Sequence, residues 1–413
     1  MNKFFKNFWL VVLSVSTFAA LGQSQTIADE KFEKATIIKI GMLAPLHLET
    51  GMVSANAAKL AVEEINSKGG ILGKKVELVV RDDQFNPTVS VDALKKLVYE
   101  DRCTIICGGW SSGAALAMQE HLKELNVVYL GAGGPGSPML VENVRKNYDK
   151  YKYYFMLMHN TERHNPVTLE YVREILVNEL KMKKIAFLSE AATWTKPFEP
   201  FMKRELPKLG IEIVASEYVG LKTPDFVPIF TKIAATGAEY ILVNAAITPG
   251  QFITKGWVEA KAPPIGCHST DAQPADYWEK TGGLCNTEVT FWCMGGNIPI
   301  TPKTQPFHDR YLKKFGRSPT FSGYNVYDGI YIIADVFQRI KSLETEAIIR
   351  GFEETAYLGT TGLIEWQKED HDIKIGPGRP TNYFVQWQNG KQVVLYPKRL
   401  RTGNFMYPPW IKK

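Results

Sequence analysis

The sequence lacks the short motifs that mark zinc peptidases and P-loop nucleotide-binding enzymes. It contains no H-E-x-x-H and no P-loop. Its net charge of +6 includes no dense block of lysine and arginine, which argues against a nucleic-acid partner. After residue 22, no run reaches the roughly 18 apolar residues that a membrane-spanning helix needs. These absences predict a non-enzymatic chain with no metal ion, no cofactor and no nucleic-acid partner.

Cysteine is scarce, and its spacing argues against a metal or redox site. No C-x-x-C pair occurs among the five residues, which are Cys103, Cys107, Cys267, Cys285 and Cys293. On one strand, Cys103 and Cys107 would lie about 13 Å apart, too far for a disulfide. Cys285 can pair with Cys293 if the chain turns between them, and Cys267 can pair with either. We favour buried structural thiols over these bridges.

The N-terminus has the three regions of a secretory signal peptide. Lys3 and Lys6 give a basic start, and residues 8–21 form a mostly apolar stretch too short to span a membrane. Ala20-Leu21-Gly22 is a small-x-small cleavage site. We therefore predict that residues 1–22 are removed near Gly22 and that the mature protein is periplasmic, with a signal anchor or a buried helix as the alternative.

Two stretches of the chain alternate short apolar strands with amphipathic helices. This rhythm is typical of parallel sheets wound with helices, and it predicts two α/β units in tandem. Asn389-Gly390 between two alternating runs predicts a hairpin near the C-terminus. The predicted strands cover residues 37–43, 76–83, 104–109 and 127–130 in the first unit, and 184–190, 211–219, 240–246 and 263–267 in the second.

The stretch from Val127 to Pro138 resembles a dinucleotide-binding loop, because its glycines fit G-x-G-x-x-G after a predicted strand. A true fingerprint follows the first strand of its fold, and an acidic residue ends the next strand about 20 residues later. Here the loop follows the fourth strand and contains Pro135, and Asp149 precedes an aromatic run instead of ending a strand. We predict a loop that lines another ligand's site, with a purely structural loop as the alternative.

The preceding strand ends in a sequence suited to binding an anion. Gly108-Gly109 is followed by Trp110 and then by Ser111-Ser112 at the predicted start of a helix. Exposed N–H groups and serine hydroxyls at a helix N-terminus attract negative charge, so a carboxylate fits there. The alternative is that the two serines only cap their own helix, and both roles can coexist.

Four segments in combination resemble the periplasmic leucine/isoleucine/valine-type solute-binding proteins of ABC transporters. They are INSKGGILGKKVELVVRDDQFNP (65–87), ICGGWSSGAALA (106–117), TPDFVPIFTKIAATGAEYILV (223–243) and YNVYDGIYIIADVF (324–337). The resemblance covers essentially the whole mature chain. It implies an α/β type I periplasmic binding protein fold, in which two doubly wound parallel-sheet lobes are joined by three hinge crossovers and close over a ligand.

The resemblance also implies boundaries and a function. With crossovers near residues 158, 288 and 358, lobe 1 would comprise residues 36–157 plus 289–357, and lobe 2 residues 158–288 plus 358–413. The protein would be a monomeric receptor that delivers a branched-chain or hydrophobic amino acid, or a related carboxylate, to an inner-membrane ABC permease. A binder of amides, urea or aromatic acids is one alternative, and a sensory ligand-binding protein is another.

Site residues follow from the same resemblance. Carboxylate contacts fall on Ser112 and on the loop residues Gly133 and Gly134. Where amino-acid binders commonly have Ala-x-Thr or Ala-x-Ser, this chain has Gly133-Gly134-Pro135, which lacks the hydroxyl and one N–H. The remaining predicted lining residues are Trp110, Ser111, Trp194, Ala246 and Tyr324.

The expected acceptor for a ligand ammonium group is missing. The position that carries an acidic residue in amino-acid binders falls on His268, and Asp271 would serve only if the loop were shifted. Aromatic walls, a small Ala246 and no obvious ammonium acceptor favour a small organic acid or amide, aromatic or branched. Ordinary packing of the aromatic residues, and a loop role for His268, are the alternatives.

Overall fold

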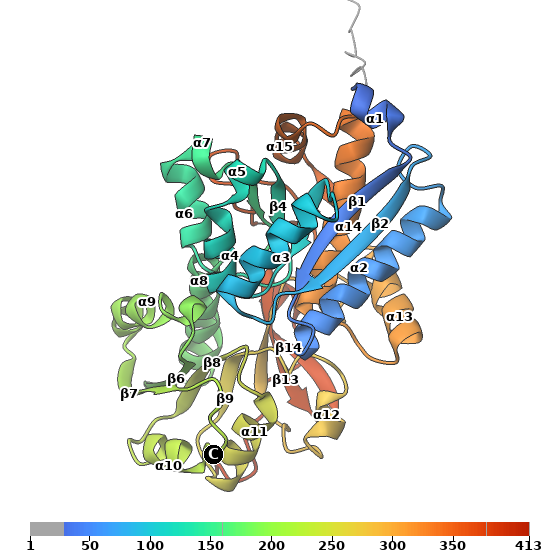
Figure 1. The fold of residues 1–413 in the computed structure, drawn as a ribbon. Coiled ribbons are helices and arrows are strands. Elements are labelled where there is room, and N and C mark those ends of the chain that lie inside the picture. The colour runs from blue at the N-terminus through green and yellow to red at the C-terminus, as the bar shows by residue number, and fades with distance from the viewer. Residues whose placement is uncertain (1–28, 159, 377, 413) are drawn as a thin grey trace, which may run out of the picture.

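The structure is a computed structural model that describes residues 29–158, 160–376 and 378–412, with the side chains of Cys267 and His268 left out (Figure 1). The predicted signal peptide, residues 1–22, lies outside the described residues. Within them, no helix is both long and apolar enough to cross a bilayer.

Lobe 1 is built on a five-stranded parallel sheet in the order β2-β1-β3-β4-β5. Its strands are β1 (Ile37–Ala44), β2 (Lys75–Asp82), β3 (Ile105–Gly108), β4 (Val128–Gly131) and β5 (Tyr154–Met156). The last three are buried along their whole length, as parallel strands covered on both faces are. The helices of this lobe are α1 (Glu30–Lys34), α2 (Glu49–Ser67), α3 (Pro87–Tyr99), α4 (Ser112–Gln119), α5 (Leu122–Leu125), α6 (Met139–Lys146), α7 (Tyr148–Tyr151), α13 (Thr304–Phe315), α14 (Phe321–Ile340) and α15 (Thr345–Glu353), and a small hairpin pairs β11 (Tyr357–Leu358) with β12 (Leu363–Ile364).

Lobe 2 is built on a seven-stranded sheet in the order β14-β13-β10-β9-β8-β6-β7. Its strands are β6 (Lys184–Glu190), β7 (Glu212–Val219), β8 (Tyr240–Ala245), β9 (Ile265–Ser269), β10 (Val289–Cys293), β13 (Asn382–Gln388) and β14 (Lys391–Tyr396). The predicted hairpin is confirmed as β13–β14, with positive φ angles at Asn389 (51°) and Gly390 (80°), as its two-residue turn requires. The helices are α8 (Thr161–Tyr171), which continues as a π-helical segment (Val172–Glu179), α9 (Phe198–Glu205), α10 (Val227–Ala234), α11 (Gly250–Glu259) and α12 (Tyr277–Lys280).

The two sheets repeat one topology. The order β2-β1-β3-β4-β5 of lobe 1 corresponds to β7-β6-β8-β9-β10 of lobe 2. In each sheet the order reverses at the first strand of the unit, β1 or β6, and ligands of such sheets bind outside the carboxyl ends of the strands at this point. The prediction of two tandem α/β units is confirmed, and the shared topology directs attention to the strand ends that face the other lobe.

The chain crosses between the lobes three times, and the second and third crossings lie later than the sequence analysis places them. The first lies between β5 and α8. β10 pairs with β9 and β13, so the second crossing follows Cys293 instead of residue 288. Trp366 Nε1 donates to the Met156 carbonyl at 2.8 Å, and the Met156 N–H donates to the His371 carbonyl at 3.1 Å. These bonds keep the chain on lobe 1 past residue 358, and the third crossing lies between Ile373 and β13.

The four cysteines whose side chains are described, Cys103, Cys107, Cys285 and Cys293, are buried and form no disulfide with one another, as we favour from the sequence. The bridge between Cys285 and Cys293 that the spacing allows is not formed. Burial raises the pKa of the Cys103, Cys107 and Cys285 thiols to about 12, so these groups stay protonated and unreactive at neutral pH.

Candidate ligand-binding cleft

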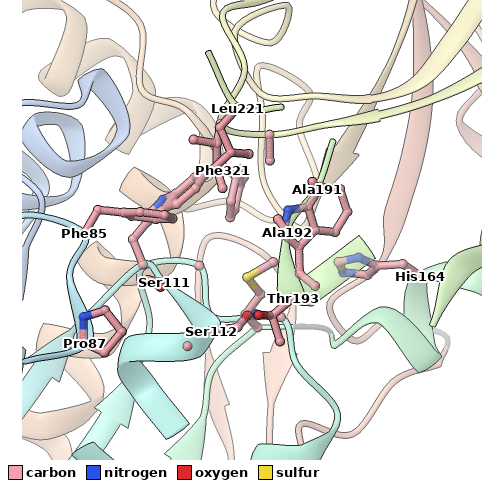
Figure 2. A pocket seen from close by; sticks show the side chains of 18 residues that line it. Phe85, Pro87, Ser111, Ser112, His164, Ala191, Ala192, Thr193, Leu221 and Phe321 are labelled. Carbon is pink, nitrogen blue, oxygen red and sulfur yellow. The ribbon is translucent and has the colours of Figure 1, made fainter. Parts of the chain in front are cut away.

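A pocket of about 260 Å³ lies between the lobes, where the carboxyl ends of both sheets meet (Figure 2). Its walls come from the segments that follow β2 to β8 and from the start of α14. Lobe 1 supplies Phe85, Pro87, Trp110, Ser111, Ser112, Gly113, Gly134, Gly136, Met158 and Phe321. Lobe 2 supplies His164, Ala191, Ala192, Thr193, Trp194, Leu221, Ala246 and Ile247.

One side of the pocket is an aromatic wall. The Trp110 ring lies 6.0 Å from the Phe85 ring and 6.4 Å from the Phe321 ring, centroid to centroid. Figure 2 shows Phe85 and Phe321 on one side of the space and His164 on the opposite side. Ligand pockets are commonly apolar with a few placed polar groups, and this wall suits a hydrophobic or flat ligand body.

Hydrogen-bond donors gather at the N-terminus of α4. Ser111 is the N-cap, and its Oγ accepts from the Ala114 N–H at 3.3 Å. Ser112 Oγ accepts from the Gly136 N–H at 3.0 Å, which leaves the Ser112 hydroxyl proton to donate elsewhere. The N–H groups of the first helical turn lack intrahelical acceptors and carry the positive end of the helix dipole. This end of the pocket can therefore hold an anion. Ser111 caps the helix, and Ser112 orders the facing loop.

The glycines of the Val127–Pro138 segment permit a close approach of two loops. A Cβ added to Gly133 would lie 1.9 Å from the Gly109 carbonyl oxygen, and one added to Gly134 would lie 3.0 Å from Trp110 Nε1. The loop after β4 therefore packs flat against the loop after β3. Trp110 is 6% exposed, and its Nε1–H has no hydrogen-bond partner among the described residues. A ligand acceptor in this pocket would satisfy that buried donor.

Glu190, which sequence reasoning missed, orders the lobe 2 wall. This fully buried residue ends β6, and its carboxylate accepts from Trp194 Nε1 at 2.9 Å, from the Thr248 N–H at 2.8 Å and from Thr248 Oγ1 at 3.0 Å. The Ile247 N–H donates to it as well, at 3.0 Å. Glu190 thus ties the loop after β6 to the loop after β8 and fixes the Trp194 indole. The only sequence signal for it is an acidic residue at the end of an apolar strand.

No carboxyl group lines the pocket among the residues that the structure describes. Among the described residues that line it, none is Asp, Glu, Lys or Arg. Asp271 lies outside the lining, where its Oδ2 accepts from the Gly250 N–H at 2.9 Å. Burial raises the pKa of Asp271, which further weakens it as a partner for an ammonium group.

The structure brings most of the predicted site residues together. Six of them line the pocket: Trp110, Ser111, Ser112, Gly134, Trp194 and Ala246. Gly133 lies behind the lining, and its N–H points to the Gly108 carbonyl at 3.4 Å. Tyr324 is fully buried outside the pocket, with its ring 4.9 Å from that of Phe307. The side chain of His268 lies outside the described part of the chain.

Several lining residues carried no signal of their own in the sequence. His164, 5% exposed, comes from the first turns of α8, and its Nε2 lies 3.8 Å from Cys293 Sγ. Met158 lies at the first crossing, and Phe321 opens α14 after the second. These residues meet only because the crossovers bring both lobes to one cleft. Looking for residues at the ends of strands within one lobe therefore does not identify them as lining residues.

A model of the periplasmic binding protein family matches residues 37–392. The chain belongs to this family. Periplasmic binding proteins capture small solutes outside the cytoplasm and work with ABC transporter permeases, and the family is one of solute binders. The predicted type I periplasmic binding fold is thereby confirmed.

Three relatives show how far this periplasmic binding protein resembles known ones. Leu/Ile/Val-binding protein homolog 7 of Brucella abortus is 24% identical over 97% of this chain and 99% of its own length. The substrate-binding protein LivJ of Streptococcus pneumoniae, solved with isoleucine, has a TM-score of 0.74 at 20% identity, covering 87% of this chain and 100% of that one. A solute-binding protein of Rhodopseudomonas palustris, solved with 3,4-dihydroxybenzoic acid, has a TM-score of 0.74 at 19% identity, covering 91% and 99%.

Proposed function

We propose that this protein is the extracytoplasmic receptor of an ABC importer, which captures a small hydrophobic carboxylate between its lobes and delivers it to the permease. One observation carries the proposal. The donors at the start of α4 face the same small cavity as the aromatic wall, and no charged side chain among the described residues lines it. Such a cavity suits a ligand with one anionic end and one apolar end.

The anionic end would be held by neutral donors. The Ser112 hydroxyl, the first N–H groups of α4 and Trp110 Nε1 can all donate to carboxylate oxygens. Hydrogen bonds to charged groups contribute about 1.5–3 kcal/mol each, roughly twice the value for neutral pairs. A carboxylate would therefore bind more tightly than the corresponding amide, which makes the amide and urea alternatives weaker.

The acid we favour carries no α-ammonium group. The carboxylate of Glu190 already accepts from Trp194, Ile247 and Thr248, and Asp271 is bonded to the start of α11. A buried ammonium group without a partner loses several kcal/mol of solvation. The relative solved with 3,4-dihydroxybenzoic acid supports an aromatic acid as ligand. The cavity size agrees, since a cavity of about 150 Å³ is enough to bind benzene.

A branched-chain amino acid is the second candidate. It is supported by the Leu/Ile/Val-binding homolog and by the relative solved with isoleucine. It requires an ammonium acceptor that the described lining does not supply.

Two matched pairs of ligands separate these possibilities. Leucine and 4-methylpentanoate differ only in the ammonium group, and benzoate and benzamide differ in charge at nearly constant shape. By isothermal titration calorimetry, we expect each carboxylate without an ammonium group to bind at least tenfold more tightly than its partner. Tighter binding of leucine than of 4-methylpentanoate would establish the amino-acid hypothesis instead, and chemical turnover of a bound acid would refute a receptor role.

Delivery to a permease is tested in the producing cell. Deleting the gene should abolish high-affinity uptake of the radiolabelled ligand, and a copy carrying Ser112→Ala should restore only part of it. Normal uptake in the deletion strain, combined with a lost transcriptional response to the ligand, would support the sensory alternative.

A further inference from the structure

A second cavity, of about 590 Å³, lies on the flank of lobe 1 where α2, α13, α14 and β11 come together. Figure 1 shows α2 and α13 at this edge of the lobe. Glu64, which lines the cavity, lies fifteen residues along α2 from Glu49 at the start of the helix. At 1.5 Å per residue, that separation is about 22 Å. The cavity shares no lining residue with the inter-lobe cleft and is distinct from it.

The floor of this cavity is a preformed polar network. Glu64 accepts hydrogen bonds from Arg310 Nε at 2.7 Å, from the Tyr327 hydroxyl at 2.6 Å and from the Tyr331 hydroxyl at 2.7 Å. Burial opposes ionisation of Glu64, but the bonds from both tyrosines and Arg310 hold the pKa of this carboxyl below its ordinary value. Glu64 is therefore ionised, its carboxylate accepts three hydrogen bonds, and its charge balances that of Arg310.

Two lysines of the cavity add positive charge, and only Lys303 interacts with a carboxyl group nearby, the buried Asp328, without forming an ion pair with it. Lys68 Nζ lies 5.6 Å from the centre of the Tyr331 ring, and Lys303 Nζ lies 4.2 Å from the centre of the Tyr357 ring. Lys303 Nζ also donates to the Tyr357 hydroxyl at 3.2 Å. Neither ammonium group has a carboxylate partner in the described part of the chain. Lys68 lies over an aromatic ring, and Lys303 contacts the ring and the hydroxyl of Tyr357, and such neutral groups stabilise a cation less than an anion does.

We propose that this cavity is a second ligand site, which binds a small anion of two negative charges on a flat ring, such as an aryl phosphate. The charged group would lie between Lys68 and Lys303, where two ammonium groups match its two charges. The ring would pack on the tyrosines, since aromatic pairs gain from stacked or edge contacts beyond the area they bury. Pro302 and Pro306 line the same cavity and restrict the backbone at its edge. This inference does not depend on the function proposed for the cleft.

Calorimetry with phenyl phosphate on the mature protein tests the proposal. The double variant Lys68→Gln/Lys303→Gln should bind phenyl phosphate at least tenfold more weakly than the wild type. The matched control, Lys59→Gln/Lys313→Gln, removes the same charge from exposed positions on α2 and α13 outside the cavity, and it should bind within twofold of the wild type. Inorganic phosphate should bind at least threefold more weakly than phenyl phosphate.

A variant of the other site identifies where the probe binds. Ala246→Trp fills the cleft, so this variant should no longer bind the cleft ligand but should still bind phenyl phosphate. The double lysine variant should bind the cleft ligand normally and phenyl phosphate weakly. The proposal is overturned if the wild type does not bind phenyl phosphate, if the control loses as much affinity as the double variant, or if Ala246→Trp abolishes phenyl phosphate binding. Equal affinities for phenyl phosphate and inorganic phosphate would exclude the ring from the site.

Discussion

Lys280 Nζ of lobe 2 lies 3.1 Å from Glu49 Oε2 of lobe 1, so an ion pair links the two lobes. Arg317 of lobe 1 also pairs with Glu49, and Asp276 of lobe 2 lies 3.2 Å from Lys280. Nearby, the Phe321 N–H at the start of α14 points to Gln273 Oε1 across the interface at 3.3 Å. These side chains therefore link the two lobes to each other.

Removing the Lys280 charge should weaken ligand binding through the closed state. The side chains of Lys280 and Glu49 are 35% and 29% exposed, so water screens the pair and its contribution is modest. We expect Lys280→Gln to raise the dissociation constant of the cleft ligand two- to fivefold. The dissociation constant of the variant should also change less with salt concentration than that of the wild type. Lys222→Gln, which removes an exposed lobe 2 charge outside this network, should leave the dissociation constant and its salt dependence unchanged. An equal effect of this control would refute a role of the Lys280–Glu49 pair in binding.

Ser112→Ala should weaken carboxylate binding by about 1–3 kcal/mol, because it removes a donor to the ligand and the acceptor of the Gly136 N–H. Titration of benzoate measures the loss, and the melting temperature of the unliganded variant shows how much of it comes from the loop. Unchanged affinity would remove Ser112 from the ligand site.

The two tryptophans of the cleft should respond differently to the same substitution. Trp110→Phe keeps a ring but removes an unpaired donor, so we expect about tenfold weaker carboxylate binding with an unchanged melting temperature. Trp194→Phe deprives the buried Glu190 carboxylate of one donor, so the free energy of unfolding should fall by about 1–2 kcal/mol. Calorimetry and denaturant unfolding distinguish the two outcomes, and the opposite pattern would contradict the assigned roles.

Glu288 should make the protein less stable as the pH rises. This fully buried carboxyl lies between β9 and β10, and burial raises its pKa to about 8, although Thr254 donates to it at 2.6 Å. The folded protein therefore holds a proton that the unfolded chain releases near pH 4.5, and stability is lost between about pH 4.5 and 8. We expect Glu288→Gln to flatten the decline of the unfolding free energy over that window, by an amount on the order of a few kcal/mol. If the unfolding free energies of wild type and variant depended on pH in the same way, Glu288 would not be the source of the decline.

Local sequence patterns predicted much of the fold and part of the site. Asn86 caps α3 through its side chain, which accepts from the Thr88 N–H at 2.9 Å, and Pro87 occupies the first helical turn, where a proline is favoured. Asn389-Gly390 forms the expected hairpin turn. Ser111 and Ser112 lie where a strand end meets a helix start. Each of these features depends on neighbouring residues alone, so a short window of sequence contains the information.

Only the tertiary structure decided which sheet each late strand joins and which residues meet in the cleft. β10 is an apolar run that fits either lobe, and its place follows from hydrogen bonding to β9 and β13, about 20 and 90 residues away along the chain. Glu190 became an organising residue because its burial requires donors, and distant Thr248 and Ile247 supply them. The side chain of Tyr324, which belongs to the same apolar helix as Phe321, lies in the core instead of the cleft. Backbone pairing and the need to satisfy buried polar groups act across the whole chain, and no local pattern encodes them.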